Sequence, residues 1–255
     1  MAVSGEPQTF WDHLEELRKS IFRVLAVFAT LTVTMFFFKN FLFDKVILAP
    51  ASSDFFLYRM LGVDFSLSLV NLEVSAQFMI HMKVTFLCAL VLSVPYLIYE
   101  IWKFVLPALY ENEKKSVRGA LGFASILFYI GLAVAYSVIF PFMLNFFANY
   151  QVSPDVPNNF SLSSYISMFI STMLAFGIVF EFPAVIAALS SLGIVSRSLL
   201  KQYRKHAFVV ILILSAVITP SGDPFTMMVV CLPLYLLYEL SILICKDKPA
   251  EMIEE

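Results

Sequence analysis

Charged residues are scarce in this chain of 255 residues, since only 14% are Asp, Glu, Lys or Arg whereas 60% are hydrophobic. The mean hydropathy of +0.85 lies outside the usual range of soluble domains. The formal net charge is only -2, and the sequence has neither a block of Lys and Arg nor an RNA-binding motif. This composition predicts a polytopic membrane protein and argues against nucleic acid as a partner.

Cysteines and catalytic motifs are also few. The three cysteines, Cys88, Cys231 and Cys245, lie in or beside apolar segments, with neither C-x-x-C spacing nor an adjacent His, so buried thiols are expected and not a metal site. The intramembrane-protease signatures, G-x-S-x-G with a partner His or paired Asp residues within spans, are missing. We therefore predict no cofactor and no enzymatic activity.

Long apolar runs divide the chain into six expected transmembrane helices. The last two uncharged runs are short, with sixteen residues in 207–222 and fifteen in 224–238. At about 1.5 Å per residue they reach roughly 22 to 24 Å, against ~30 Å for the hydrocarbon core. Either the membrane is distorted near this hairpin, or its turn lies inside the interface while Glu239 snorkels. The expected spans are 21–38, 78–101, 119–148, 164–189, 207–221 and 225–243.

Six spans put both ends of the chain on one side, and the basic residues indicate which side. Of the seventeen Lys and Arg residues, thirteen lie on the side of the termini, where positive charges keep loops cytoplasmic. We therefore expect a single membrane domain, 1–255, with both termini in the cytoplasm. Its expected parts are an amphipathic cytoplasmic helix (1–20), a periplasmic cap loop (39–77), cytoplasmic loops (103–118 and 190–206) and a cytoplasmic tail (246–255).

Two segments on the expected cytoplasmic side carry acidic residues beside apolar and aromatic ones. TFWDHLEELRKSI contains Glu16, and FVLPALYENEKKSVR contains Glu113. The acids of the first segment either form helical i,i+3 or i,i+4 pairs with Arg18 or Lys19, worth only ~0.2 to 0.5 kcal/mol, or form a ligand site. Those of the second are either a solvated charge cluster or part of the same site. Two separate acids on one face suit a partner with two arginines and a following apolar stretch, because Arg binds each carboxylate through a planar fork.

A third acid stands inside an apolar run, in FGIVFEFPAVI (176–186). A charged carboxylate at such depth costs at least ~2.5 kcal/mol, so Glu181 is expected to face protein or water. Pro183 removes a backbone hydrogen bond and leaves the carbonyl of Val179 in need of another partner. A hydrated pocket fits both residues, and the alternative is a carboxyl bonded to a neighbouring helix as packing glue.

Four segments in this order, HLEELRK (13–19), KFVLPALYENEKK (103–115), FGIVFEFP (176–183) and TPSGDPF (219–225), resemble the TatC family, the multispanning subunit of the twin-arginine protein translocase. The resemblance implies an all-α fold of six helices in a curved, cup-like arrangement, with the last two short. It also implies that Glu16 and Glu113 bind the twin arginines of signal peptides. Arg18 is then a neighbouring organiser, and Phe104 lines the site.

The resemblance assigns further positions. It implies that Glu181, next to Pro183, is the family's buried acid facing a concave cavity. It implies structural or partner-contact roles for Pro50, Thr219, Asp223 and Met227, with Thr219 a polar contact for TatA- or TatB-type subunits. The chain departs from the family pattern where Met227 replaces a frequent Gln and where Lys114 and Lys115 replace a frequent Arg.

The function implied is that of a translocase subunit in the bacterial cytoplasmic membrane. It would recognise twin-arginine signal peptides of folded proteins and, in a multimeric complex with TatA- and TatB-type single-span subunits among membrane lipid, support export driven by the proton-motive force. The residues leave two other functions open. One is a proton-coupled carrier of small solutes that uses Glu181 as a relay, and the other is an inert membrane scaffold.

Overall fold

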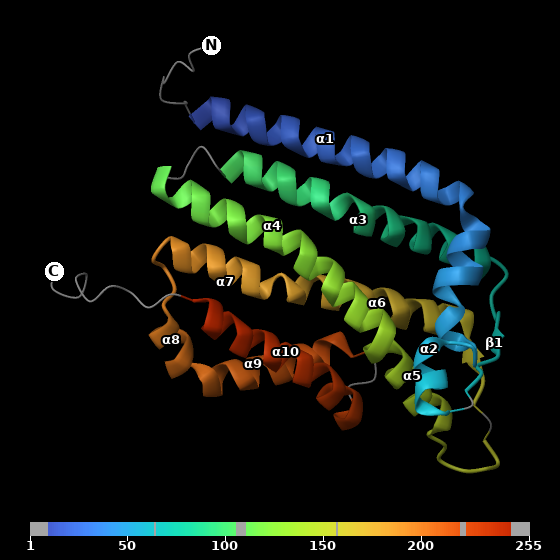
Figure 1. Ribbon diagram of the computed structural model, residues 1–255. Helices are drawn as coiled ribbons and strands as arrows, with labels where there is room; N and C mark the ends of the chain where they lie inside the picture. Colours follow the sequence, from blue (N-terminus) through green and yellow to red (C-terminus); the bar gives the residue numbers. More distant parts are fainter. Residues whose placement is uncertain (1–9, 64, 106–110, 157, 220–222, 246–255) are drawn as a thin grey trace.

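Long apolar helices make up most of the fold (Figure 1). The computed structural model describes the chain apart from residues 1–9, 64, 106–110, 157, 220–222 and 246–255, and apart from the side chains of 10, 12, 105 and 111–121. The main helices are α1 (Phe10–Phe37), α3 (Ala76–Val105), α4 (Glu111–Val134), α5 (Phe140–Asn149), α6 (Leu162–Phe180), α7 (Phe182–Ser191), α8 (Arg197–Gln202), α9 (Arg204–Ile218) and α10 (Pro224–Ile244).

Five helical stretches of the described chain are long and apolar enough to cross a membrane. They are His13–Phe37, Ala76–Phe104, Gly122–Asn149, Leu162–Ser191 and Pro224–Ile244, and they correspond to five of the six predicted spans. The remaining predicted span, 207–221, is α9, which has 15 residues. At ~1.5 Å per residue α9 is about 22 Å long, shorter than the hydrocarbon core, as its uncharged run predicted.

The last helix matches the predicted span 225–243 to within one residue at each end, but it is longer than the uncharged run 224–238. Helix α10 has 21 residues, because it continues past Glu239 to Ile244. Glu239 does not end the helix, since its carboxylate lies 2.6 Å from the Arg204 guanidinium and 3.1 Å from the Tyr235 hydroxyl. A carboxylate that is paired with a base and hydrogen-bonded can stay at the edge of a membrane helix. The prediction of two short helices is therefore correct for α9 and wrong for α10.

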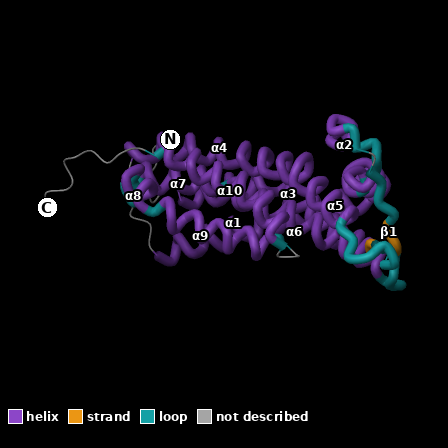
Figure 2. Tube along the Cα trace, turned by 90° about the horizontal axis from the view of Figure 1, so that it is seen from below, coloured by secondary structure: helices purple, strands orange, loops and turns teal. Residues whose placement is uncertain are grey.

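The helices form a row in which α3 lies between α1 and α4, α6 and α7 follow α4, and α10 separates them from α9 (Figure 1). At one end of the bundle α1 and α4 begin and α3, α7 and α10 end; we call it the terminal end. At the other end, the cap end, both strands and the short helix α2 (Phe56–Leu61) lie (Figure 2). Helix α1 is continuous from Phe10 to Phe37. The described part of the expected surface helix (1–20) and the first span therefore belong to one uninterrupted helix.

Helices α4 and α6 approach each other closely because glycines face phenylalanines across their contact. A Cβ on Gly131 of α4 would lie 2.7 Å from the Phe176 carbonyl oxygen and from Cβ of Phe180 on α6. Reciprocally, a Cβ on Gly177 of α6 would lie 2.7 Å from the Phe128 ring of α4. Beyond this contact the third span continues through the π-helical segment η4 (Ala135–Ile139) into α5, whose first turn contains Pro141.

The segment 39–77 folds over the cap end of the bundle. It contains a π-helix η1 (Phe41–Ile47), a 3-10 turn η2 (Ala49–Ala51), helix α2 (Phe56–Leu61) and strand β1 (Leu69–Val70), which pairs in parallel with β2 (Phe160–Ser161). Three tyrosine hydroxyls hold its backbone to the bundle. Tyr136 donates to the Val46 carbonyl (2.8 Å) and Tyr165 to the Ile47 carbonyl (2.6 Å).

The third, Tyr58, is 2% exposed, and its hydroxyl lies 3.1 Å from the Pro50 carbonyl and 3.3 Å from the Pro141 carbonyl. Burial raises the pKa of this hydroxyl, so it stays a donor at any physiological pH. We expect Tyr58→Phe to destabilise the protein by about 1 kcal/mol, because it leaves buried carbonyls without a donor. Thermal unfolding in detergent measures this. Tyr150→Phe, a change at an exposed tyrosine, is the control and should leave the midpoint unchanged.

Candidate functional site

The terminal end of the contact between α1 and α3 carries the first group of predicted site residues. The His13 ring stacks on Phe104, with 4.1 Å between ring centroids and 24° between planes, and so connects the first turns of α1 to the last turn of α3. Glu16 lies one turn further along α1 and is half-buried, whereas Arg18 is exposed. We call this contact, from His13 and Phe104 to Arg23 and Glu100, the α1–α3 seam.

The structure distinguishes the two neighbouring acids of this segment. Glu15 pairs with Lys19, 2.8 Å away at i,i+4, and both side chains are more than half exposed. This is the solvated pair that helical spacing alone predicts, and such pairs contribute little. Glu16 and Arg18, in contrast, have no hydrogen bond or ion pair with any described residue. Glu16 therefore has its carboxylate available for a ligand.

The second predicted acid, Glu113, belongs to the first turn of α4, which starts at Glu111 at the terminal end of the bundle. Its side chain, like those of Lys114 and Lys115, lies outside the described residues. The backbone thus puts Glu113 at the same end of the bundle as Glu16.

A partly buried ion pair in the same seam was missed by the sequence analysis. Arg23 of α1 contacts Glu100 of α3 through both carboxylate oxygens, with Nε–Oε1 at 2.9 Å and Nη2–Oε2 at 2.7 Å. Arg23 Nη2 also donates to the Ser20 hydroxyl at 2.8 Å, and the Tyr96 hydroxyl donates to Glu100 Oε1 at 2.8 Å. Glu100 is only 4% exposed. A signal existed in the sequence, because Arg23 is the only charged residue of the expected span 21–38 and Glu100 is the only acid of the expected span 78–101.

The second predicted site is a cavity of about 560 Å³ between α3, α4, α6 and α7, which we call the Glu181 cavity. Glu181 lies at the junction between α6 and α7, and the buried Pro183 follows in the first turn of α7. The Oε1 atom of Glu181 is buried without a described hydrogen-bond partner. The other lining side chains are apolar: Leu90, Val94, Leu97, Ile98, Ile101, Trp102, Ala124, Phe128, Leu174, Ile178, Ala184, Val185, Ala188 and Leu189.

This arrangement favours a ligand site over packing glue for Glu181, because no described side chain bonds to the buried oxygen. The cavity also reaches the seam, since its lining residues Ile101 and Trp102 lie within one helical turn of Phe104 on α3. An apolar helix with one hydrogen-bond donor at the depth of Glu181 matches these walls. The last turns of α3 thus contribute residues both to the seam and to the apolar cavity.

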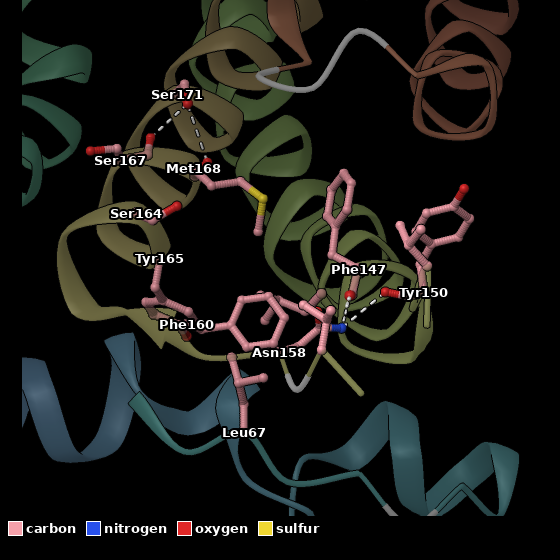
Figure 3. A pocket seen from close by; sticks show the side chains of 13 residues that line it. Leu67, Phe147, Tyr150, Asn158, Phe160, Ser164, Tyr165, Ser167, Met168 and Ser171 are labelled. Atoms are coloured by element: carbon pink, nitrogen blue, oxygen red, sulfur yellow. Dashed lines mark hydrogen bonds between the residues drawn. The ribbon is translucent and has the colours of Figure 1, made fainter. Parts of the chain in front are cut away.

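A second cavity, of about 570 Å³, lies at the cap end between α5, α6 and the segment that joins them (Figure 3). Its polar groups are mostly engaged in the fold. Asn158 donates to the carbonyls of Phe147, Ala148 and Tyr150, and the Ser171 hydroxyl donates to Ser167. None of the predicted site residues lines it.

The remaining predicted residues lie near the turn that joins α9 to α10 and in the cap. Thr219 is 3% exposed, and its hydroxyl donates to the Ser215 carbonyl at 2.9 Å. The hydroxyl proton is therefore already used in a hydrogen bond within α9. Asp223 caps α10 by accepting from the Thr226 N–H at 2.8 Å, a stabilising cap of a helix N-terminus. Met227, one turn later, is half-buried, and Pro50 is buried in the cap.

Comparison with known proteins identifies the family. A sequence profile described as "Sec-independent protein translocase protein (TatC)" matches residues 12–233. The chain belongs to the TatC family. Similar TatC proteins include that of Blattabacterium sp. subsp. Periplaneta americana, 38% identical across 92% of this chain and 94% of that protein. The TatC of Helicobacter pylori strain 26695 is 36% identical across 92% of this chain and 86% of its own length, and that of Escherichia coli K12 is 32% identical across 93% and 88%.

A solved structure confirms the fold class. A crystal structure of TatC, described as a twin-arginine translocase receptor in DDM, superposes with a TM-score of 0.76 at 28% identity, over 92% of this chain and 99% of that one. The TatC resemblance inferred from four short segments is therefore correct. The relatives are translocase proteins, and the carrier hypothesis finds no support among them.

Proposed function

We propose that this TatC protein is the receptor subunit that recognises twin-arginine signal peptides for Sec-independent protein export. The observation that supports this most is that Glu16 has no described partner and lies one helical turn from His13, whose ring stacks on Phe104. Phe104 in turn lies within one helical turn of Ile101 and Trp102, which line an apolar cavity. The similarity to a crystal structure described as a twin-arginine translocase receptor supports the same function.

The order of groups along the surface matches the order of groups in such a ligand. An arginine reaches Glu16 through a charge-assisted fork, and the second arginine requires a second acid, for which Glu113 is the candidate. The apolar part of the signal then enters the Glu181 cavity, whose walls come from α3, α4, α6 and α7. Arg18 is exposed next to Glu16 and limits the negative charge of the site.

We propose that the terminal end of the bundle faces the cytoplasm and the cap end the periplasm. Thirteen of the seventeen basic residues fall in segments on the side of the termini, and positive charges keep loops cytoplasmic. Signal peptides then meet Glu16 before they enter the membrane. TatA- and TatB-type single-span subunits complete a multimeric complex in the bacterial cytoplasmic membrane, and the proton-motive force drives export.

The double variant Glu16→Gln, Glu113→Gln tests this proposal. We expect it to lower binding of a synthetic twin-arginine peptide by about a hundredfold or more, because each charged hydrogen bond contributes ~1.5 to 3 kcal/mol. Photo-crosslinking and affinity of the full chain in detergent measure the loss. Glu15→Gln, which removes an equal charge one residue away, should bind as the unchanged chain does. Undiminished crosslinking in the double variant would refute the site.

A further inference from the structure

The inference concerns how α1 is held on the bundle. Helix α1 packs on α3 at the edge of the helix row, and several of its large apolar side chains, among them Phe22 and Leu25, point outward. Within lipid, outward apolar groups give no net drive toward a neighbouring helix, so close packing and polar bonds decide where a helix lies. The position of Glu16, on the same rod, therefore depends on the few polar bonds of the seam.

The Arg23–Glu100 pair is suited to fix that position. A fork with two parallel bonds, at 2.9 and 2.7 Å, constrains both the rotation of α1 and its shift along α3. Ser20 orients the guanidinium and Tyr96 the carboxylate. The pair is shielded on the Glu100 side, where 4% of the side chain is exposed, and loss of one partner would leave an unpaired charge inside the span.

Helical spacing connects this pair to the recognition residues. Ser20 and Arg23 follow Glu16 at i+4 and i+7, so all three share one face of α1. On α3, Glu100 and Phe104 follow Tyr96 at i+4 and i+8 and also share a face. The two helices run in opposite directions, so the ion pair and the His13–Phe104 stack are successive contacts of one seam.

We propose that Arg23 and Glu100 are positioning residues that set the register of α1 on α3 and thereby hold Glu16 beside Phe104 for the signal's arginine. This inference rests on the proposed function. The pair itself does not touch the peptide; it determines where the binding carboxylate stands.

Peptide affinity in three variants of the full chain tests the inference. Glu100→Gln should lower affinity for the twin-arginine peptide about tenfold or more, a shift of ~1.4 kcal/mol per decade. The reversed pair, Arg23→Glu with Glu100→Arg, should restore affinity to within about threefold, since a fork of either polarity fixes the register. Glu239→Gln breaks the Arg204–Glu239 pair, 2.6 Å at the opposite side of the row, and should leave affinity unchanged.

Thiol crosslinking reports the register without peptide. In a background with Cys88, Cys231 and Cys245 replaced by Ser, a short bifunctional thiol reagent should join the pair His13→Cys, Phe104→Cys readily, and adding Glu100→Gln should reduce the yield severalfold. Cysteines at Phe28 and Phe86, whose rings lie 6.2 Å apart further along the seam, should crosslink equally with and without Glu100→Gln. This second pair shows that the variant still inserts and folds.

Unchanged affinity and unchanged His13–Phe104 crosslinking in Glu100→Gln would overturn the inference. It would also be overturned if the reversed pair crosslinked normally but failed to bind, because the side chains would then act on the peptide directly. Failure of the proposed function would give a different result, because peptide affinity would then be unchanged in the Glu16→Gln, Glu113→Gln double variant.

Discussion

Gly131→Leu is expected to prevent stable folding of this TatC. The Cβ of any side chain at this position would lie 2.7 Å from the carbonyl oxygen of Phe176, which belongs to the α6 backbone and cannot move alone. The same atom would lie 2.7 Å from Cβ and Cγ of Phe180. Leucine adds more atoms to a contact that has no room for one, so α4 and α6 must separate. We expect a loss of about 3 kcal/mol or more.

Size-exclusion yield and thermal unfolding in detergent measure this effect. Gly122→Ala is the matched control, since Gly122 lies on the same helix with nothing within 4 Å of an added Cβ. It should be neutral or stabilise α4 by up to ~1 kcal/mol, because Ala has the higher helix propensity. A Gly131→Leu protein that unfolds at the temperature of the unchanged chain would contradict the close approach of α4 and α6.

The contact at Gly131 illustrates what the sequence predicts and what it leaves open. Apolar runs locate the helices because length and hydropathy are local properties, and five of the predicted spans match helices long enough to cross a membrane. Which faces meet is a property of pairs of helices. Gly131 and Gly177 stand out only when Phe180 and Phe128 are seen opposite them. Likewise α10 passes Glu239 because Arg204, 35 residues earlier, pairs with it.

The candidate site divides in the same way. The acids of HLEELRK are predicted from the sequence, but helical periodicity cannot tell Glu15 from Glu16; the structure does, because Lys19 engages Glu15. The apolar surroundings of Glu181 are also predicted, whereas its cavity depends on residues from four helices. The bidentate ion pair of Arg23 and Glu100 joins positions 77 residues apart, and a single sequence does not show which distant residues pair.

Glu181→Ala is expected to separate signal binding from export. The variant removes the carboxylate from a cavity whose other lining side chains are apolar, and it leaves Glu16, the His13–Phe104 stack and the ion pair of the seam in place. Peptide affinity should therefore stay within about threefold of the unchanged chain. Export of a twin-arginine reporter with the partner subunits present should fall by about two orders of magnitude, the scale of a lost buried polar contact worth ~3 kcal/mol.

Glu181→Gln is the informative companion, because it keeps the shape and one hydrogen-bonding oxygen while it removes the ability to carry charge. If the partner helix or the signal needs only a polar contact at the α6–α7 junction, the Gln variant should recover most of the export that the Ala variant loses. If charge itself is needed, both variants should fail alike. Loss of peptide binding in Glu181→Ala would refute the division of labour, because Glu181 would then belong to the first encounter with the signal and not to the step that follows it.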